Sequence, residues 1–335
     1  MILLFLLAGC AFSVPAKGQY QGDITIDSNG TINPSTAPIQ QVGALYLLTS
    51  DIYGSITVNT NNLVLDGNGH DVICTGSGQD IIAITLNDVS NDTVENFSLS
   101  GGWFGIAFSG NSCTISDNSI SGTGNGIQVY NSQTAGISVT GDSNIITGNN
   151  LESNYDGIVF NGGENNLIVE NIIEGSANPY GESSYGLMFW GSSNNTIYHN
   201  YFENNVVQAA DSSCDSPFPV NTWDDGYPKG GNYWSDYQTK YPDAKDIGDT
   251  GIGNIPYVID GDNVDHYPLM NIALPLSNQQ PDSTPTLTPT PTPTASVPEL
   301  PPLALLTLII ATSIFAVFIY RKKAEDKPSA RISVH

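Results

Sequence analysis

Basic residues are scarce in this sequence of 335 residues, which holds nine Lys and Arg against 33 Asp and Glu and carries a net charge of −24. Residues 18–300 contain no arginine and only the lysines Lys229, Lys240 and Lys245. Proteins that bind nucleic acid through its phosphates need a basic surface. The composition therefore excludes nucleic acid as the main partner. The same shortage argues against a lyase for acidic sugars, because that chemistry needs a cation and a base.

Residues that bind copper are also rare, with four Cys, four His and three Met in the whole chain. Copper prefers thiolate, thioether and imidazole ligands. After the N-terminal segment, none of these residues forms a close pair in the sequence. We therefore expect no dedicated copper site and no required cofactor.

Long apolar runs occur only near the two ends. The apolar run at residues 2–14 is too short to span a bilayer and leads into small residues, which predicts a signal peptide at residues 1–18. Residues 7–10 also fit a bacterial lipobox, with Cys10 as the lipidated residue. Residues 303–320 are uncharged and are followed by basic residues. They predict a single-pass helix with a cytoplasmic tail at residues 321–335, and a body outside the cell.

A segment rich in Thr and Pro precedes the predicted membrane helix, at residues 275–302. Such a composition does not bury a core and favours extended polyproline II. We expect a stalk that lifts the body off the membrane. A flexible linker is the alternative.

A short motif recurs through the middle of the chain. Its members are TISDNSI, IITGNNL, LIVENII and TIYHNYF, at residues 114–120, 145–151, 167–173 and 196–202. The anchor positions Val94, Ile115, Ile146, Ile168 and Ile197 indicate a period near 22 residues with two insertions. No stretch has a long helical period. The sequence therefore predicts an all-β fold, a right-handed parallel β-helix with rungs of about 22 residues.

One asparagine stands at the same place in each motif: Asn118, Asn149, Asn171 and Asn200. Asparagine tolerates the left-handed conformation of a sharp turn, and its amide can bond to neighbouring rungs. We expect a structural ladder of stacked side chains. A polar row that binds a ligand is the alternative.

Three segments resemble the NosD-type parallel β-helix family: LVLDGNGHDV at 63–72, WDDGYPKGGNYWSDY at 223–237 and GIGNIPYVIDGDNVDHYPL at 251–269. Members of this family are described as periplasmic copper-binding, or as carbohydrate-binding and sugar-hydrolysis proteins, and many are archaeal surface proteins. The resemblance implies a secreted β-helix with a C-terminal cap. We expect an N-terminal strand or cap region at 19–62, repeats at 63–209 and a cap block at 210–274.

The cap block holds a run of acidic residues that predicts a calcium site. Its aspartates are Asp243, Asp246, Asp249, Asp260, Asp262 and Asp265. Hard cations favour loops rich in carboxylates. An acidic turn without a cation is the alternative.

Aromatic residues beside Gly or Ser suggest a carbohydrate-binding surface, because exposed rings pack against sugar faces. Trp103, Tyr185 and Trp190 are the candidates, and packing in the protein is the alternative. For Trp223 and Trp234 we expect packing in the cap.

The leading hypothesis is a membrane-anchored surface protein whose non-catalytic β-helix contacts neutral or cell-envelope glycans. A hydrolase on the same fold is the competing hypothesis. It requires acids that converge on one face, and the candidates are Asp142, Glu152, Asp156, Glu164, Glu170 and Glu174. Copper handling, as the family description suggests, is a third hypothesis.

Overall fold

The computed structural model describes residues 19–74, 81–123, 125–130, 141–177, 184–211 and 220–271. All of them belong to a compact unit that covers residues 1–279. The predicted signal peptide, the stalk at 275–302, the helix at 303–320 and the tail at 321–335 lie outside the described residues. Within the described ranges, no helix has the length and apolar character needed to cross a membrane.

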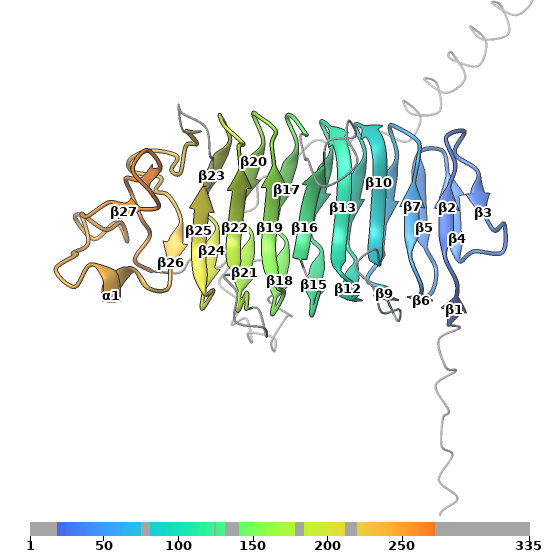
Figure 1. Cartoon of the computed structure of the whole chain (residues 1–335), viewed down its shortest axis with the longest axis horizontal. Coiled ribbons are helices and arrows are strands. Elements are labelled where there is room, and N and C mark those ends of the chain that lie inside the picture. The colour runs from blue at the N-terminus through green and yellow to red at the C-terminus, as the bar shows by residue number, and fades with distance from the viewer. Residues whose placement is uncertain are drawn as a thin grey trace, which may run out of the picture. The chain divides into compact units, whose positions relative to one another are not determined.

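Three long sheets build this unit, and the strands of each sheet follow one another along its length (Figure 1). Within the described residues, the first sheet consists of β1 (Tyr20–Gln21), β6 (Ile52–Tyr53), β9 (Asp71–Cys74), β12 (Ser98–Gly101), β15 (Ser119–Ser121), β18 (Asn150–Glu152), β21 (Ile172–Glu174), β24 (Tyr201–Glu203) and β26 (Tyr233–Trp234). The second sheet, from its other end, consists of β25 (Val207–Asp211), β22 (Tyr185–Trp190), β19 (Asp156–Asn161), β16 (Asn125–Tyr130), β13 (Phe104–Asn111), β10 (Ile82–Ser90), β7 (Ile56–Val58), β2 (Ile24–Ile26) and β3 (Ile32–Asn33). The third sheet consists of β23 (Thr196–Tyr198), β20 (Leu167–Val169), β17 (Ile145–Thr147), β14 (Thr114–Ser116), β11 (Thr93–Glu95), β8 (Val64–Asp66), β5 (Leu45–Leu48) and β4 (Ile39–Val42).

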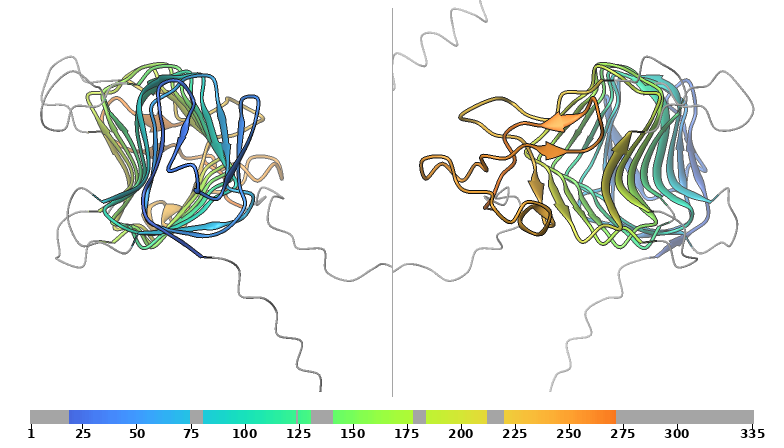
Figure 2. Two further views of the ribbon diagram at one scale, coloured as in Figure 1. Left: turned by 90° about the vertical axis from the view of Figure 1, so that its right-hand side faces the viewer. Right: turned by 60° about the vertical axis from the view of Figure 1, so that its left-hand side comes forward.

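Each rung passes through the three sheets in turn, as β13, β14 and β15 do, and Figure 2 shows the sheets as the sides of one coil. The pairing between rungs is parallel, and the predicted anchors Val94, Ile115, Ile146, Ile168 and Ile197 are register partners in the third sheet. All five are fully buried. The predicted repeat is therefore confirmed, and the unit is nearly all β with parallel sheets, as a parallel β-helix requires. The inserted residues do not change the register.

The parallel sheets begin before the predicted boundary at residue 63. β1 and β2 pair in parallel with β6 and β7, so residues 19–62 contribute rungs. Only β3 and β4 pair antiparallel with their neighbours at this end. At the other end, β26 of the predicted cap block extends the first sheet by pairing with β24. The short helix α1 (Tyr237–Lys240) and the pair β27 (Tyr257–Val258) and β28 (Val264–Asp265) follow.

The four ladder asparagines form one buried row at the corner between the third and first sheets. Each side-chain amide donates to the amide oxygen of the next, with N–O distances of 3.1 Å from Asn118 to Asn149, 2.9 Å from Asn149 to Asn171 and 2.9 Å from Asn171 to Asn200. The row continues from Asn200 to Asn232 at 3.0 Å. Because each amide both donates and accepts, the row satisfies itself in the absence of water.

The left-handed residue of this turn is not the asparagine, as we expected, but the residue before it. Asp117, Gly148, Glu170 and His199 have φ angles of 54°, 65°, 58° and 55°. The asparagines themselves do not have positive φ. Their side chains also bond backbone carbonyls, as Asn149 does with Ile115 at 2.9 Å. Asparagine is therefore required here for its amide, and the preceding position makes the turn.

A second asparagine ladder lies at the corner between the second and third sheets. The side-chain amide of Asn166 donates to Asn195, and that of Asn195 to Asn221, at 2.9 and 3.0 Å. The backbone N–H groups of Asn144 and Asn221 donate to Asn166 and Asn263, both at 2.9 Å. This ladder was not predicted from the sequence, although Asn144, Asn166 and Asn195 each stand two residues before an anchor isoleucine.

The end of the coil is closed by aromatic packing. Trp223 and Trp234 are 1% exposed, which confirms the prediction that they pack in the cap. The Trp234 ring stacks between Phe202 and Tyr257, at 4.5 and 4.2 Å between ring centroids. The hydrophobic column of the first sheet therefore continues into the C-terminal block.

Candidate functional site

Of the three aromatic residues predicted to bind glycans, Trp103 and Tyr185 lie where strands of the second sheet begin, and Trp190 lies where a strand ends. Trp103 directly precedes β13, and Trp190 ends β22, with exposed fractions of 38% and 46%. Tyr185 is half-buried at the start of β22, three strands along the sheet from β13. Since neighbouring strands lie about 4.8 Å apart, Trp103 and Tyr185 are separated by roughly 14 Å. The structure therefore does not join these rings in one platform.

The aspartates predicted to hold calcium have separate structural contacts. Asp265 is fully buried and accepts hydrogen bonds from the Asn232 N–H and the Trp234 indole, at 2.7 and 2.9 Å. Asp246 and Asp260 accept backbone N–H bonds within their own turns. The remaining three are exposed: Asp243, Asp249 and Asp262. Among the described residues, no three His, Cys, Asp or Glu side chains lie close enough to hold one metal ion.

A row of glutamates crosses the outer surface of the first sheet. Glu152, Glu174 and Glu203 are direct register partners on β18, β21 and β24. Glu152 is exposed, and the other two are half-buried. The parallel column beside the row ends in Tyr201 and Tyr233, which are also register partners. We call these five residues the acidic face.

The three glutamates of the acidic face repel one another, because they are direct neighbours of like charge. Burial, and then the neighbouring carboxylates of Glu203 and Glu152, raise the pKa of Glu174. Like charges that stand directly opposite on neighbouring strands destabilise a sheet. Among the ion pairs of the described residues, none involves these glutamates. A carboxyl group with a raised pKa, such as that of Glu174, marks a candidate functional site.

The two tyrosines of the acidic face stack on each other, so that each ring covers one face of the other. The rings of Tyr201 and Tyr233 stack on each other with centroids 4.5 Å apart and an interplanar angle of 11°. Burial, and then a hydrogen bond between the Tyr201 hydroxyl and Glu203, raise the pKa of Tyr201. The hydroxyl and the carboxylate therefore form one polar strip.

The acidic face can bind a ligand that donates several hydrogen bonds at a regular interval along the coil. Ionised carboxylates accept such bonds and do not donate them. Consecutive carboxylates repeat at the rung spacing of about 4.8 Å. An extended chain with hydroxyl or ammonium groups on each unit meets this requirement.

Glu152 and Glu174 are two of the acids predicted as candidates to converge on one face, and the structure brings these two together. Glu203 was missed, although Ser121, Glu152, Glu174 and Glu203 each follow one of the four recurring motifs directly. Aligning that position across the motifs would have identified the row. The other acids predicted as candidates for a hydrolase lie elsewhere. Asp142 and Glu164 precede the strands β17 and β20 of the third sheet, and Asp156 begins β19. Glu170 lies at a turn.

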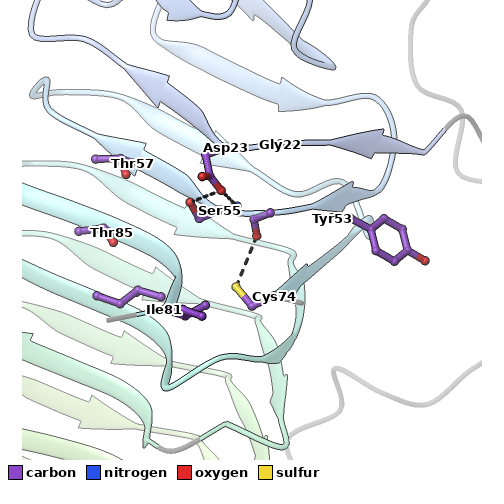
Figure 3. Close-up of a pocket in the computed structure, with 10 residues that line it drawn as sticks. Gly22, Asp23, Tyr53, Ser55, Thr57, Cys74, Ile81 and Thr85 are labelled. Atoms are coloured by element: carbon purple, nitrogen blue, oxygen red, sulfur yellow. Dashed lines mark hydrogen bonds between the residues drawn. The ribbon is translucent and has the colours of Figure 1, made fainter. Parts of the chain in front are cut away.

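A separate pocket of about 410 Å³ opens at the N-terminal part of the coil, where the first sheet turns into the second (Figure 3). Asp23 accepts hydrogen bonds there from the backbone N–H and the hydroxyl of Ser55, at 3.0 and 2.9 Å. The Cys74 thiol donates to the Gly54 carbonyl at 3.4 Å. These contacts engage Asp23, Ser55 and Cys74 within the protein.

The residues that would bind copper do not gather in one place. Burial raises the pKa of Cys74 and Cys113 to about 11, so both remain thiols at neutral pH. Each described histidine has its own contact: His70 with Asp51, His199 with the Lys229 carbonyl and His266 with Asp224. Because copper centres combine several such ligands, the described residues do not fit a dedicated copper site.

Comparison with known proteins gives a family and a similarity to solved structures, of which we describe one. The alginate lyase from Paenibacillus sp. str. FPU-7 is 14% identical, with 54% of this chain and 92% of that chain covered and a TM-score of 0.17. At that score the likeness supports no argument about function. No curated protein matches the chain. The profile of the family described as periplasmic copper-binding protein (NosD) matches residues 24–239, which span most of the coil. This chain therefore belongs to the NosD family of β-helix proteins.

Proposed function

We propose that this protein is an extracytoplasmic β-helix that binds glycans of the cell envelope without cleaving them, through the acidic face. The observation that carries the proposal is the register of Glu152, Glu174 and Glu203, three carboxylates with no cationic partner among the described residues. Sugar hydroxyls donate hydrogen bonds to such carboxylates. The family description as periplasmic supports a place outside the cytoplasm.

The repeated geometry suits many weak contacts made in parallel. Three consecutive rungs offer one carboxylate each, and Tyr201 and Tyr233 add two hydroxyl groups at the end of the row. Contacts made by linked units raise the overall affinity well above that of one unit. A long glycan should therefore bind much more tightly than a single sugar.

Replacing Glu152, Glu174 and Glu203 together by serine should weaken glycan binding roughly tenfold or more. Serine is a conservative choice because Ser100 and Ser121 occupy the same column on the preceding rungs. The measurement is binding of the purified body to a glycan array and to isolated envelope fractions. Glu95→Ser, an outward-facing glutamate on the third sheet, is the control and should bind normally.

Trp190→Ala distinguishes this site from the surface predicted by aromatic residues alone. The exposed Trp190 ring lies on the second sheet, away from the acidic face. If Trp190→Ala abolished binding while the triple serine variant bound normally, the glycan site would lie on the second sheet.

A hydrolase on the same face is the second candidate. Glu174 and Glu203 stand on adjacent strands. A separation of about 5 Å between two carboxyl groups is the arrangement of a retaining glycosidase. The raised pKa of Glu174 suits a general acid. Release of reducing ends from an envelope glycan, lost in Glu174→Gln, would favour the enzyme over the binding protein.

We also propose that residues 303–320 anchor the body to the membrane, with the stalk at 275–302 between them. The apolar segment followed by basic residues supports this arrangement. Protease added to intact cells should release the body, while residues 321–335 stay protected. Immunoblots against both parts are the measurement. A body that resists protease on intact cells but not after lysis would contradict the proposal.

A further inference from the structure

We infer that Asn29 carries an N-linked glycan and that the fold selects it over three other asparagines in the same acceptor sequence. The chain contains four Asn-x-Ser/Thr acceptor sequences, which begin at Asn29, Asn91, Asn96 and Asn194. Such a modification requires the body to lie outside the cytoplasm, as proposed above. It is independent of glycan binding by the acidic face.

Attachment of a glycan needs access to two side chains of the acceptor sequence. The amide nitrogen of the asparagine attacks C1 of a sugar that is joined to a lipid phosphate. A C1–N bond forms, the C1–O bond to the phosphate breaks, the phosphate leaves, and the amide loses one proton to the solvent. The transferase must also reach the Ser or Thr hydroxyl of the acceptor sequence. Both groups must therefore be exposed and free of the bonds that hold the coil together.

Asn29 meets these requirements. It lies in the turn between β2 and its antiparallel neighbour β3, at the end of the coil opposite to α1 (Figure 1). Asn29 and Thr31 are both exposed. The Asn29 side-chain oxygen accepts the Thr31 backbone N–H at 3.0 Å. None of the hydrogen bonds among the described residues engages the Asn29 amide nitrogen or the Thr31 hydroxyl. Both reacting groups are therefore open to a transferase.

The turn is held from its inner side. The buried Tyr46 hydroxyl donates to the Gly30 carbonyl at 2.8 Å, and the Gly30 N–H donates to the Asp27 carbonyl at 2.7 Å. Gly30 has a φ of 81°, which favours glycine, so the Asn-Gly pair suits the turn itself. The Thr31 hydroxyl takes no part in these contacts. The turn therefore explains Asn29 and Gly30, whereas the acceptor sequence also explains the threonine.

The other three acceptor asparagines are used by the coil. Their φ angles are 60°, 59° and 58°, so each forms a left-handed turn between two strands. Each of their side-chain amides donates to the preceding rung: Asn91 to Asn62 at 3.2 Å, Asn96 to Asp66 at 3.1 Å and Asn194 to Glu164 at 3.4 Å. A transferase would have to break these bonds to use the nitrogen.

The remaining residues of those three acceptor sequences are also built into the coil. The middle residues are 1%, 2% and 0% exposed, and they are Asp92, Phe97 and Asn195. The last residues lie in strands with a paired neighbour on each side, and they are Thr93, Ser98 and Thr196. A transferase can bind such a tripeptide only if a rung opens. The folded protein therefore offers Asn29 alone among the four.

The test presents the folded full chain, made in a host without N-glycosylation, to an oligosaccharyltransferase and a lipid-linked oligosaccharide. Mass spectrometry of proteolytic peptides locates the glycan, and we expect it on Asn29 only. Synthetic peptides centred on each of the four asparagines should all be modified, because no fold protects them. Thr31→Ser should keep the modification of Asn29. Thr31→Val, which preserves the shape of the side chain, should abolish it.

Two results with the purified chain would overturn the inference. One is an unmodified Asn29 in the folded chain although its peptide is modified, and the other is modification of Asn91, Asn96 or Asn194 as fast as that of Asn29. The chain isolated from its own cells tests the location. A body that protease releases from intact cells, but whose Asn29 carries no glycan, would overturn the modification and leave the proposed place intact. A body in the cytoplasm would refute the proposed place and the modification together.

Discussion

Replacing Asn171 by alanine should lower the free energy of unfolding by about 3 kcal/mol or more, because several buried hydrogen bonds are lost at once. Its amide donates to the carbonyls of Ile146 and Val169, at 2.8 and 3.0 Å, and to Asn200 at 2.9 Å. Its oxygen accepts the backbone and side-chain N–H groups of Asn149, at 3.0 and 2.9 Å. Alanine leaves these partners buried without water.

Chemical denaturation of the purified body measures this effect, and Asn150→Ala is the matched control. Asn150 lies on the neighbouring strand β18, where it pairs with Ile172, the residue that follows Asn171. Its side chain faces outward and is only half-buried. Its replacement should change the free energy of unfolding by less than about 0.5 kcal/mol. Equal midpoints for Asn171→Ala and the wild type would show that the ladder does not stabilise the coil.

The protein should become more stable as the pH falls from about 7 towards 4. Burial raises the pKa of Asp92 and Asp156 to about 6, and that of Asp211 and Asp265 to about 7. In the unfolded chain an aspartate titrates near 3.9. Between these values the folded state binds more protons than the unfolded state. Stability is therefore highest below about 4 and is lost as the pH rises through 6 to 7.

Asp92→Asn should raise stability at pH 8 by on the order of 2 kcal/mol and flatten the pH dependence. Asp92 is 1% exposed; one carboxylate oxygen accepts the Leu63 N–H at 3.0 Å, and the other has no partner. It occupies the position that Asn144 takes two rungs later in the second ladder. An amide there carries no charge to desolvate.

Thermal unfolding between pH 4 and 8 measures both effects, with Asp262→Asn at an exposed turn as the control. The control should follow the wild-type curve. A wild-type protein that loses stability steadily from pH 7 to pH 4 would contradict the predicted direction. An Asp92→Asn variant with the wild-type slope would show that this carboxyl does not contribute.

The repeat and its buried residues could be predicted from the sequence because their signals are local. Ile115 and Ile146 each stand three residues before a ladder asparagine, and that spacing is visible without any contact map. The aromatic packing of Trp223 and Trp234 was predicted for a similar reason, since both lie within one short block. The turn conformation was predicted at the wrong residue, because composition does not show which of two neighbouring residues has positive φ.

The sequence alone determined the class of fold and the ladder asparagines, because apolar residues and amides recur at matching positions within each short motif. Only the tertiary structure decided which surface residues meet. Glu152, Glu174 and Glu203 are separated by 22 and 29 residues, and they align because the strands that carry them pair in register. Trp103 and Trp190 both look like exposed rings in the sequence. In the second sheet they lie at opposite ends of their strands, because Trp103 directly precedes β13 and Trp190 ends β22.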